Sequence, residues 1–387
     1  MLVSRLEPFR TTVFAEMTEL AVRHEAINLG QGFPDEDGPA SMLEAACSAI
    51  LSGANQYTPG AGAWDLREAV ADDRYSRYGI KYDPQHEVLI TVGATEGITA
   101  AILALTERGD EVVLIEPFFD SYPAAVALAG ATLRTATMET DGDCFVLDID
   151  SVRAAITPAT KVLVVNSPHN PTGSVMTEAE AAAIADLAVS HDLIVVVDEV
   201  YEHLVFDGRR HISLATLPGM RERTISVSSA GKTFNVTGWK IGWVCGPAHL
   251  VSAVRAAKQF MSFVSGAPLQ PAIAVALRNE LPWVRAMRDD LNIKRDILRT
   301  ALSNAGFKVH ASQGTYFVIA DATPLSLGDA TKLCRRMPEE IGVAAVPVSA
   351  FVTTNHHDRW RNFVRFAFSK RHDVLADASQ RLVGLHR

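Results

Sequence analysis

VLVVNSPHNPTGSVMTEAEAAAIADLAVSHDLIVVVDEVY, residues 162–201, is the stretch that decides the fold. It opens with an apolar run at 162–165 and ends with a second one at 193–197. Runs that are apolar throughout are typical of strands buried on both faces of a parallel sheet. Between them, Thr177-x-x-Glu180 is a capping box, which predicts the start of a helix with one apolar face. The stretch therefore predicts a strand–helix–strand unit.

The same rhythm continues on both sides of this unit. Further short apolar runs at 88–92, 112–115 and 224–228 predict strands, and residues 96–107 carry apolar side chains at helical spacing. Repeated strand–helix–strand units are typical of an α/β fold. We therefore expect a mostly parallel sheet that is flanked by helices on both faces.

The last third of the chain has a different character. A long amphipathic helix is predicted at 284–304, followed by separated short strands at 315–320 and 363–368. This pattern predicts a smaller α+β domain. We expect three parts. Residues 1–40 form an N-terminal segment that packs with the small domain, residues 41–280 form the large domain, and residues 281–387 form the small C-terminal domain.

Composition narrows the classes of function. The chain has 387 residues, 48% of them apolar, and a net charge of −9, which disfavours binding to nucleic acid or to an anionic membrane. The N-terminus lacks the apolar segment of a signal peptide, and no run of eighteen apolar residues predicts a membrane span. The four cysteines are widely spaced, so we expect free thiols and a cytoplasmic protein that acts on small molecules.

Chemistry-bearing residues follow the carboxyl ends of five predicted strands. In an open α/β sheet, ligands bind beyond these ends, and parallel strands bring them to one edge. The residues are, strand by strand, the small turn Gly93–Gly97, the ring of Phe119, the amides of Asn166 and Asn170, the pair Asp198 and Tyr201, and the pair Ser229 and Lys232.

One end of this set is suited to a phosphate group. The turn at Gly93 opens a helix, and the backbone N–H groups of Ala94 and Thr95 can bind an anion there. Ser229 can add a hydroxyl group and Lys240 a positive charge.

The other residues are suited to a pyridine aldehyde. Phe119 can stack on the ring, and Asp198 can keep the ring nitrogen protonated, which makes the ring an electron sink. Asn170 and Tyr201 can donate hydrogen bonds to its phenolic oxygen. Lys232 can form a Schiff base and then carry a proton. The sequence thus predicts pyridoxal phosphate as cofactor, with Lys232, Asp198 and Tyr201 as the catalytic residues.

The motifs that carry these residues also resemble a known family. Asn166-x-x-x-Asn-Pro-x-Gly173, Asp198-x-x-Tyr201 and Ser229-x-x-Lys232-x7-Lys240 are similar to the signature of fold-type-I pyridoxal-phosphate aminotransferases of class I and II. The resemblance spans nearly the whole chain. It is nearest to the branch of kynurenine aminotransferase and glutamine transaminase K, and to actinobacterial enzymes described as N-succinyldiaminopimelate aminotransferases.

The resemblance implies further site residues. Gly32 is implied to contact the substrate through its backbone, and Arg365, together with Asn170, to bind the substrate α-carboxylate. Tyr57 resembles a tyrosine that reaches the phosphate in the neighbouring subunit, which implies a homodimer with shared active sites. Phe14 and Phe263 occupy positions of substrate-facing aromatic residues. Two positions depart from the kynurenine branch, since Thr95 replaces an aromatic residue and Val264 a histidine.

The implied activity is transfer of an amino group from an L-amino acid to 2-oxoglutarate or pyruvate. N-succinyl-LL-2,6-diaminopimelate, an intermediate of lysine biosynthesis, is the donor that the resemblance favours, with kynurenine, glutamine, methionine and aromatic amino acids as alternatives. A C–S β-lyase acting on cystathionine-like substrates would use the same cofactor residues. The pyridoxal-phosphate domain of a transcription regulator is disfavoured, because no DNA-binding segment precedes the predicted domain in this acidic chain.

Three other features predict no site. Asp141-Gly-Asp143 and the following Asp148-x-Asp150 lack the spacing of a calcium loop, so we expect a turn. The pair His356-His357 is expected to be solvated in a polar loop, and no metal is predicted. The role of His169, beside Asn170, stays open.

Overall fold

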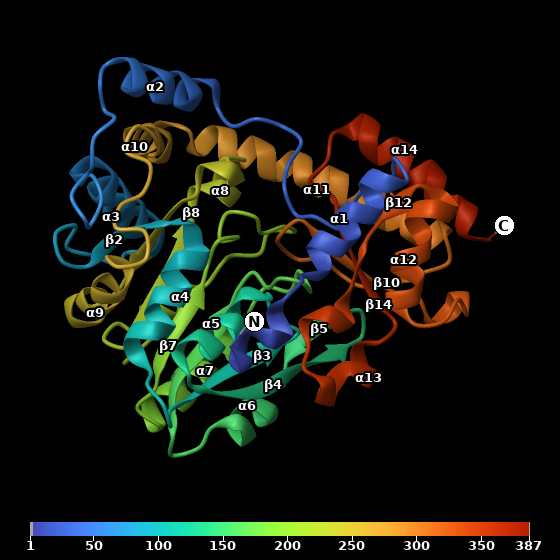
Figure 1. Cartoon of the computed structure of the whole chain (residues 1–387), viewed down its shortest axis with the longest axis horizontal. Helices are drawn as coiled ribbons and strands as arrows, with labels where there is room; N and C mark the ends of the chain where they lie inside the picture. Colours follow the sequence, from blue (N-terminus) through green and yellow to red (C-terminus); the bar gives the residue numbers. More distant parts are fainter. Residues whose placement is uncertain (1–2, 387) are drawn as a thin grey trace.

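The computed structural model describes residues 3–386, and its largest element is a sheet of eight strands (Figure 1). In spatial order the strands are β2 (Val88–Val92), β9 (Ile241–Cys245), β8 (Thr224–Ser229), β7 (Ile194–Asp198), β6 (Thr160–Asn166), β3 (Glu111–Glu116), β4 (Thr132–Asp141) and β5 (Cys144–Leu147).

Strand direction brings the predicted site residues to one edge of this sheet. β3, β4, β6, β7 and β8 are parallel neighbours, whereas β9 is antiparallel to both β2 and β8. Because two reversals cancel, β2 runs in the same direction as β8. The carboxyl ends of β2, β3, β6, β7 and β8 therefore meet at one edge. Lys240 precedes the antiparallel strand β9, so it lies at this edge too.

The apolar strands are buried on both faces, as their composition predicts. On one face, Val164 and Val196 pack with α4 (Gly93–Leu105), α5 (Ser121–Ala129) and α9 (Ala248–Lys258). On the other, Val165 and Val195 belong to the core beneath α6 (Ile149–Ala155) and α7 (Glu178–Ser190). Each fully buried valine contributes about 1.5–3 kcal/mol relative to an exposed one. A third core lies beneath α2 (Ala40–Leu51), α3 (Trp64–Tyr78) and α10 (Leu269–Asn279).

A second, smaller sheet lies to one side of the first (Figure 1). Its strands are β10 (Lys308–Val309), β11 (Phe317–Asp321), β14 (Phe363–Ala367) and β13 (Val346–Pro347). The helices around it are α11 (Leu281–Asn304), α12 (Ala330–Ile341), α13 (His357–Trp360) and α14 (His372–Leu382). The arrangement confirms the predicted fold, a mostly parallel sheet flanked by helices plus a smaller α+β part.

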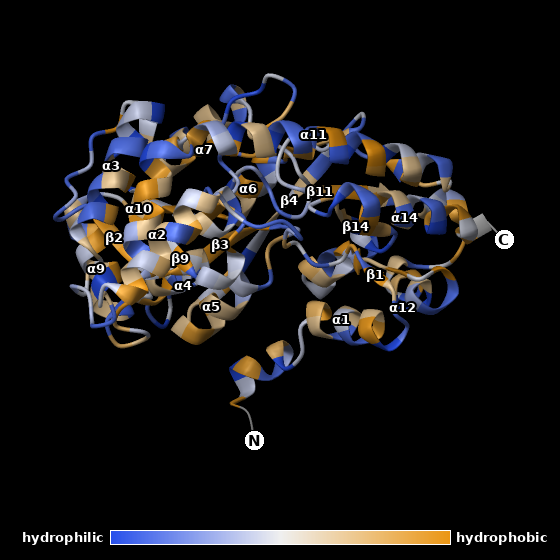
Figure 2. Cartoon of the chain, turned by 90° about the horizontal axis from the view of Figure 1, so that it is seen from above, coloured by the Kyte–Doolittle hydropathy of each residue, from blue (hydrophilic) through white to orange (hydrophobic). Residues whose placement is uncertain are grey.

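The N-terminal residues reach across to the smaller part. β1 (Ile27–Asn28) pairs in parallel with β12 (Val343–Ala344), and α1 (Val13–Arg23) contacts α12. Figure 2 shows the N-terminal segment beside α1, and its residues Ser4–Phe9 contact α5 of the large part. The division into domains at residues 40 and 280 stays a prediction. Within residues 3–386, no helix has both the length and the apolar character needed to cross a membrane.

The structure corrects the ends of several predicted elements. Gly93–Gly97 was predicted as a turn, but α4 already begins at Gly93, after the N-cap residue Val92, whose side chain forms no capping hydrogen bond. β7 and β8 each extend one residue further, so Asp198 and Ser229 are the last residues of their strands. The antiparallel hairpin of β4 and β5 had no clear strand signal, and the turn expected at Asp141 lies between them.

The remaining elements are short. The capping box at Thr177 and Glu180 is present at the start of α7, and the four cysteines are free, both as predicted. One short helix, α8 (Ala230–Thr233), follows β8 directly and carries Lys232. The 3-10 segments are Ser4–Phe9, Leu214–Thr216, Thr237–Trp239, Thr323–Leu325, Val348–Phe351, Thr354–His356 and Val383–His386.

Candidate active site

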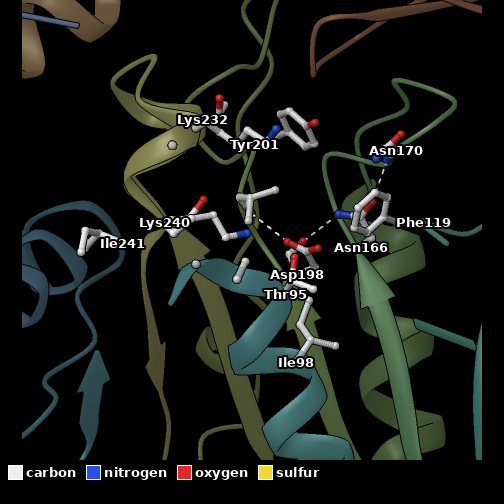
Figure 3. A pocket seen from close by; sticks show the side chains of 16 residues that line it. Thr95, Ile98, Phe119, Asn166, Asn170, Asp198, Tyr201, Lys232, Lys240 and Ile241 are labelled. Atoms are coloured by element: carbon white, nitrogen blue, oxygen red, sulfur yellow. Dashed lines mark hydrogen bonds between the residues drawn. The ribbon is translucent and has the colours of Figure 1, made fainter. Parts of the chain in front are cut away.

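A pocket of about 220 Å³ opens at the sheet edge where the strand ends meet (Figure 3). It is lined by ten of the residues that the sequence predicts for the cofactor, namely Ala94, Thr95, Phe119, Asn166, Asn170, Asp198, Tyr201, Ser229, Lys232 and Lys240. These residues come from six different segments, so the fold alone brings them together.

The start of α4 forms an anion-binding end of this pocket. No side chain caps the helix, and Glu96 is occupied in accepting the N–H of Val92 at 2.6 Å. The first N–H groups of the helix, at Ala94 and Thr95, are therefore available to a ligand. Lys240 lies against Gly93, and Figure 3 shows its ammonium group directed towards the helix start. This end of the pocket fits a phosphate group.

Gly242 is the residue that allows this close approach. A Cβ atom on Gly242 would lie 2.6 Å from the carbonyl carbon of Gly93 and 2.8 Å from the backbone nitrogen of Ala94. Both are backbone atoms and cannot rotate away. Any side chain at this position would push the helix start off β9 and change the anion-binding geometry.

Asp198 lies at the base of the pocket, with 5% of its side chain exposed. Its Oδ1 accepts the N–H of Val200 at 3.2 Å, and its Oδ2 accepts the hydroxyl group of Tyr122 at 2.5 Å. Burial raises the pKa of Asp198 to about 6, although both hydrogen bonds and the nearby Lys232 act to lower it. At neutral pH the side chain is thus an ionised carboxylate in an apolar surrounding, which favours a cationic partner such as a protonated pyridine nitrogen.

Lys232 lies on the opposite wall and is held by a tyrosine that the sequence did not single out. Its Nζ donates to the hydroxyl oxygen of Tyr316 at 2.7 Å and to the carbonyl oxygen of Gly32 at 3.3 Å. The hydroxyl group of Tyr316 in turn donates to the same carbonyl oxygen. The amine also lies over the rings of Tyr201 and Tyr316. Gly32, predicted as a substrate contact, thus anchors the free amine.

The two remaining polar walls provide donors. Tyr201 is buried, which holds its pKa well above its usual value, so its phenol is a neutral donor. Asn170 accepts from Arg365 through Oδ1 at 2.8 Å, which leaves its NH₂ group to donate. Asn166 has a structural role. Its NH₂ group donates to the carbonyl oxygen of Asp198, and its Oδ1 accepts the N–H of Asn170. These bonds hold the turn after β6 against the end of β7.

Arg365 is buried at the centre of β14, with 1% of its surface exposed. Its guanidinium group lies between aromatic rings, at 4.0 Å from the ring centre of Phe317 and about 5 Å from those of Phe14 and Phe351. It donates to Asn170 and, at 2.8 Å, to the carbonyl oxygen of Gly30. Burial lowers its pKa to about 10, so it is still charged at neutral pH.

The Nε–H group of Arg365 is buried and has no partner among the described residues. An unpaired donor on a buried cation costs about 1–3 kcal/mol or more, so the site favours an anionic ligand that accepts from it. A carboxylate matches the fork of the guanidinium group.

Five predicted residues do not line the pocket within one chain. Gly32 and Arg365 contact the lining residues Lys232 and Asn170, and Phe14 lies against Arg365. Tyr57 and Phe263 lie together at the surface, with ring centres 5.5 Å apart, and 81% of Tyr57 is exposed. Their predicted roles depend on a second copy of the chain and stay predictions. His169 lies outside the pocket, where it bonds to Thr172, and burial lowers its pKa to about 3.

The expectation that the pair His356-His357 is solvated holds for His357, which is exposed, and is wrong for His356. His356 was expected to be solvated, but it is bonded to the buried carboxylate of Glu116, which also accepts the backbone N–H of Thr353. The reason is that the segment after β13 folds back onto the end of β3, where Phe118 donates to the carbonyl oxygen of Phe351 at 2.8 Å. This contact fixes the ring of Phe351 beside Arg365.

Tyr122, Tyr316, Phe317 and Phe351 are the contacts that sequence reasoning missed. Tyr122 carried a weak signal, since it follows Phe119 by three residues and so lies on the same side of the chain after β3. The others have no local signal, because their contacts with Lys232 and Arg365 join segments that are far apart in the sequence.

The comparisons with known proteins agree with this geometry. A family model described as aminotransferase class I and II matches residues 24–382. The chain is 56% identical, over 99% of its length and 98% of the other protein, to a probable N-succinyldiaminopimelate aminotransferase of Mycobacterium tuberculosis. It is 38% identical, over 98% and 97% of the two chains, to a methionine aminotransferase of Escherichia coli.

Solved structures give the same result. The structure of N-succinyldiaminopimelate aminotransferase from Mycobacterium tuberculosis matches with a TM-score of 0.98 at 56% identity and covers 100% of both chains. Aspartate aminotransferase from Thermus thermophilus, solved with maleate, matches with a TM-score of 0.91 at 32% identity and covers 100% of this chain and 99% of the other.

Proposed function

Because the chain belongs to the class I and II aminotransferase family and is a pyridoxal-phosphate-dependent transaminase, we propose that it transfers the amino group of N-succinyl-LL-2,6-diaminopimelate to 2-oxoglutarate. The identity of 56% over almost the whole chain to a protein named for that substrate is the observation that carries this choice. The methionine aminotransferase is similar over as much of the chain, but at 38% identity.

Different residues of the pocket would bind different parts of the cofactor. The start of α4, with Ser229 and Lys240, would bind the phosphate, Phe119 would stack on the ring, and Asp198 would pair with the ring nitrogen. Lys232 would hold the aldehyde as a Schiff base. When bound, pyridoxal phosphate supplies an aldehyde that condenses with amines and a protonated ring that accepts the electron pair of a broken Cα–H bond.

The protein's own residues then bind and deprotonate the donor. Arg365 would bind the α-carboxylate through its guanidinium group, beside Asn170, which it already contacts. Binding at this point orients the α-carbon towards Lys232. The free amine of Lys232 would take the α-proton, and its hydrogen bond to Tyr316 would hold the amine in place. The same groups act in reverse on the oxo acid.

Replacing Arg365 by lysine should lower kcat/KM for the amino donor by about 10²-fold, because hydrogen bonds to a charged group contribute about 1.5–3 kcal/mol. A lysine ammonium group keeps the charge but cannot span the contacts to Asn170, Gly30 and a carboxylate together. Steady-state kinetics with varied donor measure the effect. The absorbance spectrum of the bound cofactor serves as the control, since the lysine variant should retain it.

A panel of amino donors tests the proposed substrate. Holoenzyme is mixed with N-succinyl-LL-2,6-diaminopimelate, methionine, glutamine or kynurenine, and conversion of the cofactor to its amine form is followed by absorbance. The proposal requires the highest kcat/KM with the succinylated donor. A higher value with another amino acid would overturn the choice of substrate and leave the transaminase class intact.

Cystathionine distinguishes the transaminase from a C–S lyase. A lyase would release pyruvate and ammonia from it without any oxo-acid acceptor. Turnover that depends strictly on 2-oxoglutarate or pyruvate is the result that we expect.

We also infer a homodimer that shares its active sites, in the cytoplasm. Tyr57 and Phe263 lie together and are 81% and 46% exposed, so they form an aromatic surface that water would solvate poorly. Covering it with a second copy would bring Tyr57 to the neighbouring phosphate site. Light scattering should give twice the mass of the chain, and a fully active monomer would contradict the inference.

A further inference from the structure

A second cavity, of about 420 Å³, lies beside the loop that follows β7, and it shares no lining residue with the cofactor pocket. Three segments form it, namely the end of α3, residues 202–211 and the start of α11. Its polar lining consists of Arg77, Tyr78, Glu202, His203, Arg209, Arg210, His211, Arg285 and Arg288. The transaminase reaction described above uses none of these side chains.

The cavity carries an excess of positive charge. Five arginines line it against one carboxylate, Glu202, which is buried and already bonded to Arg74 at 2.6 Å and to the hydroxyl groups of Tyr78 and Ser228. Arg77 also lies 3.7 Å from Glu202. Arg74 and Arg77 therefore already compensate the charge of Glu202, and the other four arginines of the cavity gain no partner from it.

Most of the remaining arginines have no acidic partner. Within residues 3–386, no carboxylate forms an ion pair with Arg209, Arg210 or Arg285, and Arg288 pairs only with its neighbour Asp289, which is largely exposed. Holding like charges together is unfavourable in a protein of net charge −9, where acidic partners are abundant. A bound anion would remove this cost.

His211 is a buried part of the polar lining. Its side chain is 2% exposed, and its Nε2 lies 3.1 Å from the carboxylate of Glu199. Its other ring nitrogen, Nδ1, is buried and has no partner among the described residues. When the ring carries one proton and donates it to Glu199, Nδ1 is an acceptor, so the preference of the cavity for an anion rests on its guanidinium groups.

A metal ion does not fit the same place. Glu199, Glu202 and His211 offer ligand atoms within 4.8 Å of one another, but Arg74 already pairs with both carboxylates, at 2.9 and 2.6 Å. A divalent cation would have to displace this buried guanidinium group and enter a cavity lined by five others. An extended polyanion such as nucleic acid is disfavoured by the net charge of the whole chain.

We propose that this cavity is a binding site for a small polyanion that carries at least two phosphate or carboxylate groups. Arg209, Arg210 and Arg285 bind its outer charges, and Arg77 and Arg288 bind the part that enters the cavity. The cavity and the cofactor pocket are neighbours along the chain. Glu202 of the cavity directly follows Tyr201 of the cofactor pocket. Glu202 also accepts a hydrogen bond from Ser228, which directly precedes Ser229 of that pocket. A ligand that binds the folded chain and not the unfolded one stabilises the holoenzyme by mass action.

Calorimetric titration of the holoenzyme with pyrophosphate, at constant ionic strength in a zwitterionic buffer, tests the proposal. Pyrophosphate is chosen because it carries no carboxylate for Arg365. We expect saturable binding of one molecule per chain, and cofactor absorbance that stays constant during the titration. Citrate in a parallel titration distinguishes carboxylate from phosphate ligands. Absence of saturation below about 10 mM with both anions would overturn the proposal. Because citrate can also bind Arg365, citrate binding supports the site only where Arg209→Gln/Arg210→Gln weakens it.

The double variant Arg209→Gln/Arg210→Gln should bind the anion at least about tenfold more weakly, since charge-assisted hydrogen bonds are the stronger ones. Both side chains are exposed, so the variant should fold, and its cofactor spectrum and thermal unfolding check this. The matched control is Arg336→Gln/Arg371→Gln, which removes the same charge from exposed side chains paired with Glu340 and Asp373. If both variants bind the anion equally weakly, the loss of affinity comes from net charge alone, and the site is refuted.

Discussion

The variant Lys232→Ala should lose at least about 10⁴-fold in kcat, at the upper end of what a positioned acid–base group contributes. Lys232 and Lys240 are the two lysines that line the pocket, and the amine of Lys232 is the one held by Tyr316 and Gly32, opposite Asp198. Lys240 lies against the start of α4 and cannot replace it. No other side chain lining the pocket is an amine, so neither the attachment of the aldehyde nor the proton transfer has a substitute.

Two measurements separate this role from a structural one. Borohydride reduction of the holoenzyme, followed by peptide mass spectrometry, should place the cofactor on the peptide that contains Lys232, and no reduced adduct should form in Lys232→Ala. Lys232→Arg should fail as well, because a guanidinium group does not lose its proton at neutral pH. Lys332→Ala, at an exposed position on α12, is the matched control. Retained turnover in Lys232→Ala would refute the assignment.

The residues of this pocket were predictable to different degrees. Asp198 and Lys232 follow apolar strands, and strand ends in a mostly parallel sheet meet at one edge, so local pattern was sufficient to place them together. The direction of β9 was not predictable in this way, because its apolar residues do not show whether its neighbours run parallel or antiparallel. Lys240 reaches the edge only because that strand is reversed.

The phenols and rings around the site depend on contacts between distant parts of the chain. Tyr122 bonds to Asp198 across 76 residues of sequence, and Tyr316 bonds to Lys232 across 84. Arg365 lies 195 residues from Asn170, and its position came from family resemblance, since an arginine in an alternating strand is typically solvent-facing. Periodicity describes which face of an element is buried and does not identify the partner segment.

Replacing Asp198 by asparagine should lower kcat by about 10²–10⁴-fold and weaken cofactor binding, as expected when one partner of a buried charge pair is removed. Asparagine has nearly the same shape, and its single amide oxygen can still accept the N–H of Val200 while its NH₂ group donates to the hydroxyl oxygen of Tyr122. It lacks the negative charge that would keep the ring nitrogen protonated. Kinetics and the dissociation constant of the cofactor measure the two effects, and the melting temperature of the apoenzyme shows whether the variant folds.

The pH dependence of cofactor binding gives a second measurement on the same residue. Burial raises the pKa of Asp198 to about 6, so below this pH the free carboxyl group is protonated and must lose its proton to pair with the ring. The dissociation constant should therefore rise as pH falls through about 6, by up to about tenfold per pH unit. The Asp198→Asn variant should not show this dependence.

The apoenzyme responds in the opposite sense. The folded-state pKa of Asp198 is raised from 3.8, so this group stabilises the apoenzyme most below that value, and the contribution is lost as pH rises through about 6. Cofactor binding and apoenzyme stability should thus change in opposite directions over the same pH interval. Tyr122→Phe provides the discriminating variant, because removing its hydrogen bond disfavours the charged carboxylate and should move both changes to higher pH. An unchanged pH dependence in Asp198→Asn would show that another group, and not Asp198, titrates with cofactor binding.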